Sequence, residues 1–378
     1  MRMLIISLVG QLLMNLLLLT AVWKGTIKGS IWRKVSLGWV GLELLYFVYI
    51  VVSSASLNKN GEFMRVGGLI FSNYYIYIGV LLMLLVLAYL AIWILQKTGV
   101  IKGDIPKRRA RGLAMLILMP ITLILCIQGY YNTMQPVVTR YNVSLPYNGS
   151  SHDLKIALIT DIHFGDIITQ EQVSKMAKIV QDEKPDYVFV GGDQLDYYFH
   201  FVEEYPEVTT LMRALHPDPS KIFHVLGNHE YYIDLEKKCD WLSSIGVLLR
   251  DQVVRLEDSL YLVGRDDATN KQRLPLVKLM DQVPIGSTTM VLDHQPNEPE
   301  EERASGVDLA MHGHTHDGQF IPFKWLLGMI FENSYGYIEE GGTHYITSSG
   351  FGLSSSPIRI GTKSEVVIIN LHLIRLRP

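Results

Sequence analysis

The stretch AMHGHTHDGQ, residues 310–319, places three histidines at alternate positions around a glycine. Imidazole is the commonest metal ligand among protein side chains, so this much imidazole in one turn could hold a metal ion. If the backbone stays extended beyond Gly313, His314 and His316 lie on the same face and can converge on one point. Histidine pairs with this spacing also occur as surface residues, so the stretch alone leaves both interpretations open.

Polar residues of the same kinds follow other short apolar runs in the C-terminal two-thirds of the chain. Buried strands are predicted over 155–160, 187–190, 222–226, 290–292 and 309–311, with helices over 169–184 and around 204–215. The first four strands are followed by Asp161-Ile162-His163, Gly191-Gly192-Asp193-Gln194-Leu195-Asp196, Gly227-Asn228-His229-Glu230 and Asp293-His294-Gln295. A single Asp or His at a strand end is more often a turn residue. Five such blocks at the carboxyl ends of strands indicate a dinuclear metal site.

These five blocks, D-x-H, G-D-x-x-D, G-N-H-E, a lone H and G-H-x-H, resemble the signature of the calcineurin-like metallophosphoesterases. The resemblance covers about residues 150–375 and is closest to membrane-attached or exported bacterial-type enzymes and to transmembrane proteins that carry such a domain. It implies a C-terminal α/β four-layer sandwich, in which two β-sheets pack together and are flanked by helices. It also implies two divalent metal ions, and the ligand types leave Mn, Fe, Zn and Ni open.

The resemblance assigns a role to each residue of the site. It implies a first metal held by Asp161, His163 and His316, a second held by Asn228, His294 and His314, and Asp193 bridging the two. Two such metals acidify a bridging water, so that hydroxide attacks phosphorus in line with the leaving group. It further implies that His229 assists the leaving oxygen and that Asp196 orients His229. No family role falls on His312, His224 or His344, which are predicted to be packed and hydrogen-bonded.

Two positions beside the expected phosphate pocket depart from the family pattern. Asp317 replaces a glycine that usually follows the histidine pair, and Ser348-Ser349-Gly350 stands where serine-arginine-glycine is usual. An added acid and a missing cation would shift substrate preference. A surface position for Asp317 is an equal alternative.

The run FIPFKWLLGMIF, residues 320–331, follows the metal-type histidines directly. Buried core is the commoner explanation, because large apolar residues mostly pack inside. The alternative is an interfacial lid that touches a bilayer and admits lipid-linked substrates, since aromatic and aliphatic residues beside basic ones do this at membrane surfaces.

The N-terminal third contains four apolar runs, over about 4–23, 37–54, 74–95 and 113–130. A membrane-spanning helix needs about 20 mostly apolar residues, so we predict a four-helix transmembrane domain over 1–134. The second run is borderline because it contains Glu43, an intramembrane acid that could mark an ion or lipid path or could lie near a helix end. The first run has no small-x-small cleavage site after it and is predicted to be retained. A linker over 135–150 and a phosphoesterase domain over 151–378 complete the predicted organisation.

Basic residues in the short loops predict the orientation. The first and third loops carry Lys24, Lys28, Arg33, Lys34, Lys97, Lys102, Lys107, Arg108, Arg109 and Arg111. These loops are therefore expected to be cytoplasmic, which places the C-terminal domain outside the cytoplasm. The net charge of −3 indicates no strongly basic surface, so a nucleic-acid partner is not expected.

The leading hypothesis is an integral-membrane dimetal phosphoester hydrolase whose substrate is lipid-linked or lies at the membrane surface. A second hypothesis is a nucleotide-sugar-lipid pyrophosphatase like the UDP-2,3-diacylglucosamine hydrolases, whose substrate is cytoplasmic, so the charge pattern argues against it. A third is a non-catalytic metal-binding membrane sensor or scaffold. Degenerate relatives usually lose a ligand or the acid histidine, and here all are present. The physiological substrate, monoester or diester, and the oligomeric state are left open.

Overall fold

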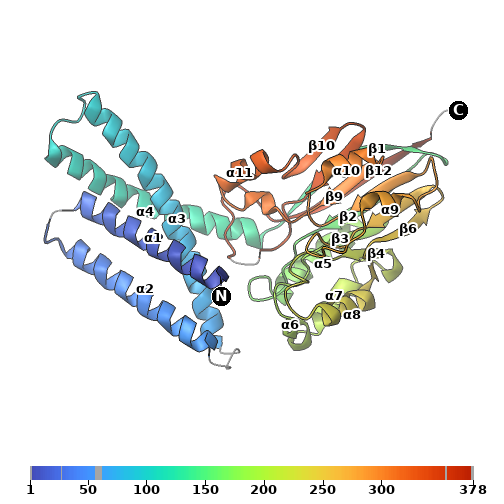
Figure 1. Cartoon of the computed structure of the whole chain (residues 1–378), viewed down its shortest axis with the longest axis horizontal. Helices are drawn as coiled ribbons and strands as arrows, with labels where there is room; N and C mark the ends of the chain where they lie inside the picture. The colour runs from blue at the N-terminus through green and yellow to red at the C-terminus, as the bar shows by residue number, and fades with distance from the viewer. Residues whose placement is uncertain (1, 27, 56–61, 354–355, 376–378) are drawn as a thin grey trace. The chain divides into compact units, whose positions relative to one another are not determined.

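The computed structural model describes residues 2–26, 28–55, 62–353 and 356–375 (Figure 1). The chain divides into two compact units between Gln128 and Gly129. Each unit has its own packed interior, so each is described by itself.

A helix forms over each of the four apolar runs, and the last of these helices ends in the C-terminal unit. These helices are α1 (Arg2–Gly25), α2 (Ile31–Ala55), α3 (Glu62–Lys97) and α4 (Asp104–Met134). Glu43 is in the middle of α2 and is buried rather than at a helix end. Among the described residues, Asn73–Lys97 and Asp104–Met134 are long and apolar enough to cross a membrane. Spans at α1 and α2 stay a prediction.

The described residues of the C-terminal unit form two six-stranded sheets. The first has the order β1 (Val137–Tyr147), β12 (Glu365–Arg375), β2 (His152–Ile159), β3 (Tyr187–Gly191), β4 (Ile222–Val225) and β5 (Val247–Leu248). The second has the order β10 (Gly336–Glu340), β11 (Thr343–Thr347), β9 (Leu309–His312), β8 (Thr288–Leu292), β7 (Leu260–Gly264) and β6 (Gln252–Glu257).

The two sheets pack face to face over one apolar core. Phe189 of β3 and Leu262 of β7 both belong to this core, whereas Val263 joins a separate cluster with Leu276 of α9 (Leu276–Met280). Consecutive strand residues point to opposite faces, so each face of the second sheet buries its own apolar residues. On the first sheet's side, α5 (Gln170–Glu183), α7 (Glu207–Arg213) and α8 (Leu235–Ile245) gather together (Figure 1). The predicted four-layer sandwich is confirmed.

The five strands that precede the predicted metal ligands form where the sequence predicts them, but they do not share one sheet. β2, β3 and β4 are parallel neighbours in the first sheet, and β8 and β9 are parallel neighbours in the second. The site therefore lies where the carboxyl ends of strands from the two packed sheets meet. The helix predicted around 204–215 is shorter in the structure, where α7 begins after Pro206 and a separate helix, α6 (His200–Glu204), ends before it.

The expected linker over 135–150 is wrong for most of its length, because residues 137–147 form strand β1. This strand pairs in parallel with β12 along its whole length. Val143, Leu145 and Tyr147 are buried while the residues between them are exposed, which is the alternation of a half-buried strand. Pro146 is tolerated because β1 is an edge strand.

Candidate metal centre

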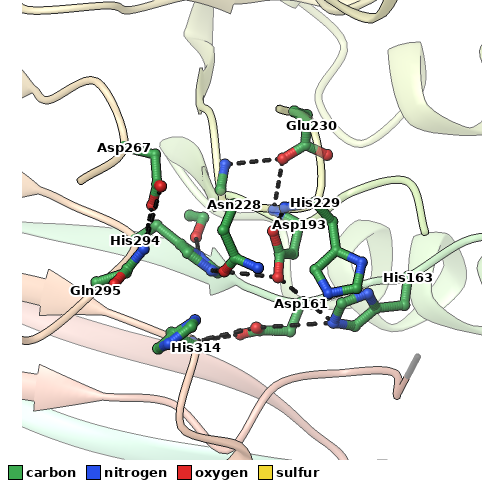
Figure 2. A network of polar contacts seen from close by, with 12 residues as sticks. Asp161, His163, Asp193, Asn228, His229, Glu230, Asp267, His294, Gln295 and His314 are labelled. Carbon is green, nitrogen blue, oxygen red and sulfur yellow. Dashed lines mark hydrogen bonds and ion pairs between the residues drawn. The ribbon is translucent and has the colours of Figure 1, made fainter. Parts of the chain in front are cut away.

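Asp193 follows strand β3 and its carboxylate lies at the centre of the polar cluster (Figure 2). Its Oδ2 is 3.2 Å from Nε2 of His294 and 3.7 Å from Nε2 of His163. Its Oδ1 accepts a hydrogen bond from the backbone N–H of His229 at 2.8 Å. One carboxylate oxygen thus lies between two imidazoles that come from different sheets.

A first group of donors forms on one side of Asp193. Potential ligand atoms of Asp161, His163 and His316 all lie within 4.8 Å of one another. Nε2 of His316 is 3.5 Å from Oδ1 of Asp161 and 3.3 Å from Nε2 of His163. Two imidazole nitrogens that face each other beside a carboxylate form an arrangement that a divalent cation stabilises.

A second group forms on the other side. Potential ligand atoms of Asp193, His294 and His314 also lie within 4.8 Å of one another. Oδ1 of Asn228 is 3.3 Å from Nε2 of His294, so the amide oxygen points toward this group. His314 and His316 therefore belong to different groups.

The idea that His314 and His316 converge along an extended strand is wrong. Strand β9 ends at His312, and φ is 67° at His314 and 52° at His316. These left-handed conformations turn the chain, so the two rings reach different sides of the cluster.

Several residues of this site adopt a strained, left-handed backbone conformation. Asp161, His163 and Asp193 also have φ between 50° and 53°. Non-glycine residues rarely adopt this region, and those that do cluster at functional sites. A Cβ on Gly227 would lie 2.2 Å from Oδ1 of Asp193, and one on Gly313 would lie 2.3 Å from Oδ2 of Asp161. The glycines let backbone approach the two carboxylates directly.

The charges of Asp193 and His316 suit metal binding. Burial alone would raise the pKa of Asp193, but the imidazoles of His294 and His163 outweigh burial and hold this pKa well below its usual range. Burial lowers the pKa of His316 to about 3, so this ring is neutral near pH 7, as a metal ligand must be. Imidazole, carboxylate and amide donors accept Mn, Fe, Zn or Ni, so these residues fit a two-metal centre.

His229 and Asp196 lie together beside the first group. Nδ1 of His229 is 3.1 Å from Oδ1 of Asp196, and the same oxygen is 3.7 Å from Nδ1 of His163. The His229 and His163 ring centres are 4.6 Å apart. Asp196 is thus placed to orient His229. It is also placed to orient His163, a predicted metal ligand, which the sequence did not indicate. The roles of both residues stay predictions.

Glu230 and Lys238 hold two of the site loops together, and sequence reasoning assigned neither a role. The buried carboxylate of Glu230 accepts four backbone N–H bonds, from Asp193, Gln194, Leu195 and Gly227, at 2.8–3.1 Å. Lys238, buried on α8, donates from Nζ to the carbonyl oxygen of His229 at 2.8 Å. The acidic residue of the G-N-H-E block was the available signal for Glu230, whereas nothing in the sequence pointed to Lys238.

Arg359 supplies a cation beside the segment where the sequence suggested that one was missing. Its fully buried guanidinium donates to the carbonyl oxygens of His316, Gly350 and Gly352 at 3.3, 3.2 and 2.9 Å. This charge comes from a position outside the five blocks.

The surface alternative for Asp317 is wrong. Its side chain is buried and its carboxylate lies 2.7 Å from Nζ of Lys324. The added acid is therefore paired within the protein. Its φ of 51° explains why glycine suits this position in the family pattern.

The three histidines predicted to be packed make ordinary structural contacts. Nε2 of His312 is 3.4 Å from Oε1 of Glu302, and Nδ1 of His224 is 3.1 Å from Oε1 of Gln194. Nδ1 of His344 is 2.8 Å from the hydroxyl of Tyr337. These contacts agree with the prediction.

Tyr232 fixes the amide of Asn228. Nδ2 of Asn228 donates to the Tyr232 hydroxyl at 2.9 Å, which leaves Oδ1 directed at His294. The Tyr232 ring stacks on Tyr197, with ring centres 5.6 Å apart and an interplanar angle of 17°. The stack holds the hydroxyl where it selects one of the two amide orientations.

We expect Tyr232→Phe to weaken the binding of Mn²⁺ at the second group by about 10–100-fold, as for other groups that orient a metal ligand. Calorimetric titration of the full chain with Mn²⁺ measures this effect. Tyr197→Phe is the matched control, because it keeps the same aromatic stack and leaves the Asn228 contact intact. Equal affinities in the two variants would show that the hydroxyl does not orient the ligand.

Comparisons with known proteins agree with the geometry. Residues 154–318 match the family model described as calcineurin-like phosphoesterase. A metallophosphoesterase from Aquifex aeolicus is 28% identical over 261 residues, which are 67% of this chain and 98% of that protein. A metallophosphoesterase from Helicobacter pylori strain J99 is 29% identical over 226 residues, 58% of this chain and 60% of that protein.

One further relative is named as a transmembrane protein, and one further match is a solved structure. A "transmembrane protein with metallophosphoesterase domain" from Bos taurus is 26% identical over 303 residues, 73% of this chain and 66% of that protein. The chain thus spans 60–66% of the length of two of these relatives and 98% of the third. A solved structure, a dimetal phosphatase from Danio rerio, aligns with a TM-score of 0.38 and 14% identity over 54% of this chain and 89% of that one.

Proposed function

We propose that this chain is a membrane-attached enzyme that hydrolyses phosphoesters with two divalent metal ions, and the match of residues 154–318 to the calcineurin-like phosphoesterase model supports this proposal. The observation that carries the proposal is Oδ2 of Asp193, which lies 3.7 Å from Nε2 of His163 and 3.2 Å from Nε2 of His294. A single oxygen between the two donor groups is what a bridging ligand requires.

The protein's own groups divide the work. When bound, two divalent ions polarise phosphoryl oxygens and lower the pKa of water. Asp161, His163 and His316 would hold one ion, and Asn228, His294 and His314 the other. Asp193 would bridge them and, through its bond to the backbone N–H of His229, would also fix the distance from the metals to the acid.

His229 would protonate the leaving oxygen. Asp196, 3.1 Å from Nδ1 of His229, would keep the proton of that nitrogen in place, so that Nε2 is the atom that faces the substrate. His229 is 8% exposed whereas neighbouring His163 is 1% exposed, so the ring of His229 is the one that substrate can reach.

Hydrolysis of p-nitrophenyl phosphate and bis-p-nitrophenyl phosphate by the full chain tests the proposed function. We expect activity with Mn²⁺, loss of that activity after chelation, and recovery when Mn²⁺ is returned, because the proposed chemistry depends on the metals. The ratio of the two rates distinguishes a monoesterase from a diesterase. Activity that survives complete metal removal, or metal-loaded protein that cleaves no phosphoester, would contradict the proposal.

We also propose that the phosphoesterase domain faces away from the cytoplasm and acts on lipid-linked or membrane-surface phosphoesters. The support is the excess of Lys and Arg in the first and third loops and the apolar segments Asn73–Lys97 and Asp104–Met134. Protease added outside intact cells should cleave a C-terminal tag in this orientation. Cleavage only after the cells are opened would place the domain in the cytoplasm.

A further inference from the structure

Helix α11 (Phe323–Ile330) presents apolar side chains to solvent. None of its residues is buried, so the core explanation for this run is wrong. Phe323, Trp325, Leu326, Met329 and Ile330 are all exposed, Trp325 by 63% and Met329 by 77%. A contiguous apolar patch of this kind on a folded unit marks an interaction surface.

The polar contacts of α11 point into the protein, which leaves its outward face apolar. Lys324 is the only charged residue of the helix, and its Nζ lies 2.7 Å from Asp317 and 5.1 Å from the ring centre of Tyr335. Asp317 directly follows His316, so α11 is attached to the loop that carries a proposed metal ligand. A displacement of α11 would therefore pull on that loop.

A short segment connects the base of α11 to the end of α4. The N–H of Arg359 donates to the carbonyl oxygen of Gly129, and Nδ2 of Asn132 donates to the carbonyl oxygen of Arg359, both at 3.0 Å. The next residue, Ile360, accepts from the N–H of Ile321 at 3.0 Å. A Cβ on Gly129 would lie 2.7 Å from Cγ2 of Ile358, so glycine permits this close approach.

These contacts place α11 next to the point where α4, a candidate membrane-spanning helix, joins the C-terminal unit. Helix α4 is long and apolar enough to cross a bilayer, and its last turn belongs to the same compact unit as α11. A bilayer that α4 crosses would lie close to this end of the unit. Several kinds of surface could cover the apolar face of α11. We favour a lipid surface, because its position follows from the connection of α11 to the end of α4.

We propose that α11 is a membrane-docking helix whose apolar face enters the boundary between lipid headgroups and acyl chains. Trp325 suits the headgroup level, and Phe323, Leu326, Met329 and Ile330 suit the acyl boundary. The inference goes beyond the proposed hydrolysis, because docking requires no catalysis. Its consequence is that the Asp317–Lys324 ion pair ties the metal-binding loop to a helix held by lipid.

An environment-sensitive fluorophore on the full chain tests the docking. The probe is attached to Met329→Cys, in a chain whose native Cys126 and Cys239 are replaced by serine and which is reconstituted into phosphatidylcholine vesicles with or without spin-labelled lipid. The matched control is Ile285→Cys. Ile285 is fully exposed and precedes β8, at the end of the second sheet opposite to the ligand-bearing loops.

We expect spin-labelled lipid to quench the probe at Met329 several-fold more strongly than the probe at Ile285. Equal, weak quenching at both positions would overturn the proposal. A blue-shifted but unquenched probe at Met329 would also overturn it, because protein rather than lipid would then cover α11.

A second measurement needs no substitution. Hydroxyl-radical labelling of the unmodified chain in the same vesicles should modify Trp325 and Met329 less than the exposed Tyr198 and Tyr232, relative to their exposures. Full labelling of Trp325 and Met329 would contradict docking even if the cysteine variants do not fold.

Discussion

Asp193→Asn should reduce phosphoester hydrolysis by about a thousandfold or more, and should lower the metal content of the protein below two ions per chain. The substitution removes the negative charge whose Oδ2 lies between His163 and His294. The two metals of such a site together contribute several kcal/mol of transition-state stabilisation, and each 1.36 kcal/mol corresponds to a factor of ten in rate. Hydrolysis of both p-nitrophenyl esters and metal analysis of the purified variant measure the two effects.

Asp186→Asn is the matched control for Asp193→Asn. Asp186 precedes β3, whereas Asp193 follows it, so the two carboxylates stand at opposite ends of one strand. Asp186 is exposed, and its Oδ2 accepts a hydrogen bond from the backbone N–H of Lys155. This variant should keep its metals and its rate. An Asp193→Asn chain that binds two ions and retains hydrolysis would remove Asp193 from the bridging position.

The parts of the site that the sequence predicts are those that follow from strand geometry and local blocks. Asp161, Asp193 and Asn228 come directly after parallel strands, and the carboxyl ends of neighbouring parallel strands meet at one edge. The membership of β8 and β9 in a second sheet could not be derived in this way. It depends on how two apolar sheet faces pack, and short apolar runs look alike in either sheet.

Contacts between distant segments were beyond the sequence. Arg359 is 43 residues from His316 and reaches its carbonyl oxygen only because the intervening chain folds back. The left-handed φ angles of His314 and His316 could not be predicted from the sequence for a related reason, since tertiary contacts rather than local preference hold them. The alternation of histidines therefore suggested an extended strand where the chain in fact turns.

Apolar character alone did not distinguish core from surface at α11. Trp325 and Leu326 would read the same in a buried helix and in an interfacial one, because both carry a run of large apolar residues. The error at 135–150 is the reverse case. The segment was predicted to be a linker, but Asn142, Ser144 and Pro146 are the exposed positions of a strand whose alternate residues are buried.

His229→Asn should lower kcat by about 10²–10⁴-fold, the usual contribution of a positioned general acid, and should leave the metal content unchanged. Asparagine places an amide nitrogen near the original Nδ1, beside Asp196, but has no group at the position of Nε2. The loss should be larger for phenyl phosphate than for p-nitrophenyl phosphate, because the poorer leaving group needs the proton more. Steady-state rates on both esters and metal analysis measure these effects.

The comparison with Asp196→Asn separates an acid from a ligand. If Asp196 only orients His229, its substitution should cost less, about 10–100-fold, and should show the same leaving-group preference. The donor atoms of His229 also lie within 4.8 Å of those of His163 and Asp193, so a role as a metal ligand is the specific alternative. Loss of one ion in His229→Asn, with equal losses of rate on the two esters, would support that alternative. Retained metals with an unequal loss would instead identify His229 as the group that delivers the proton to the leaving oxygen.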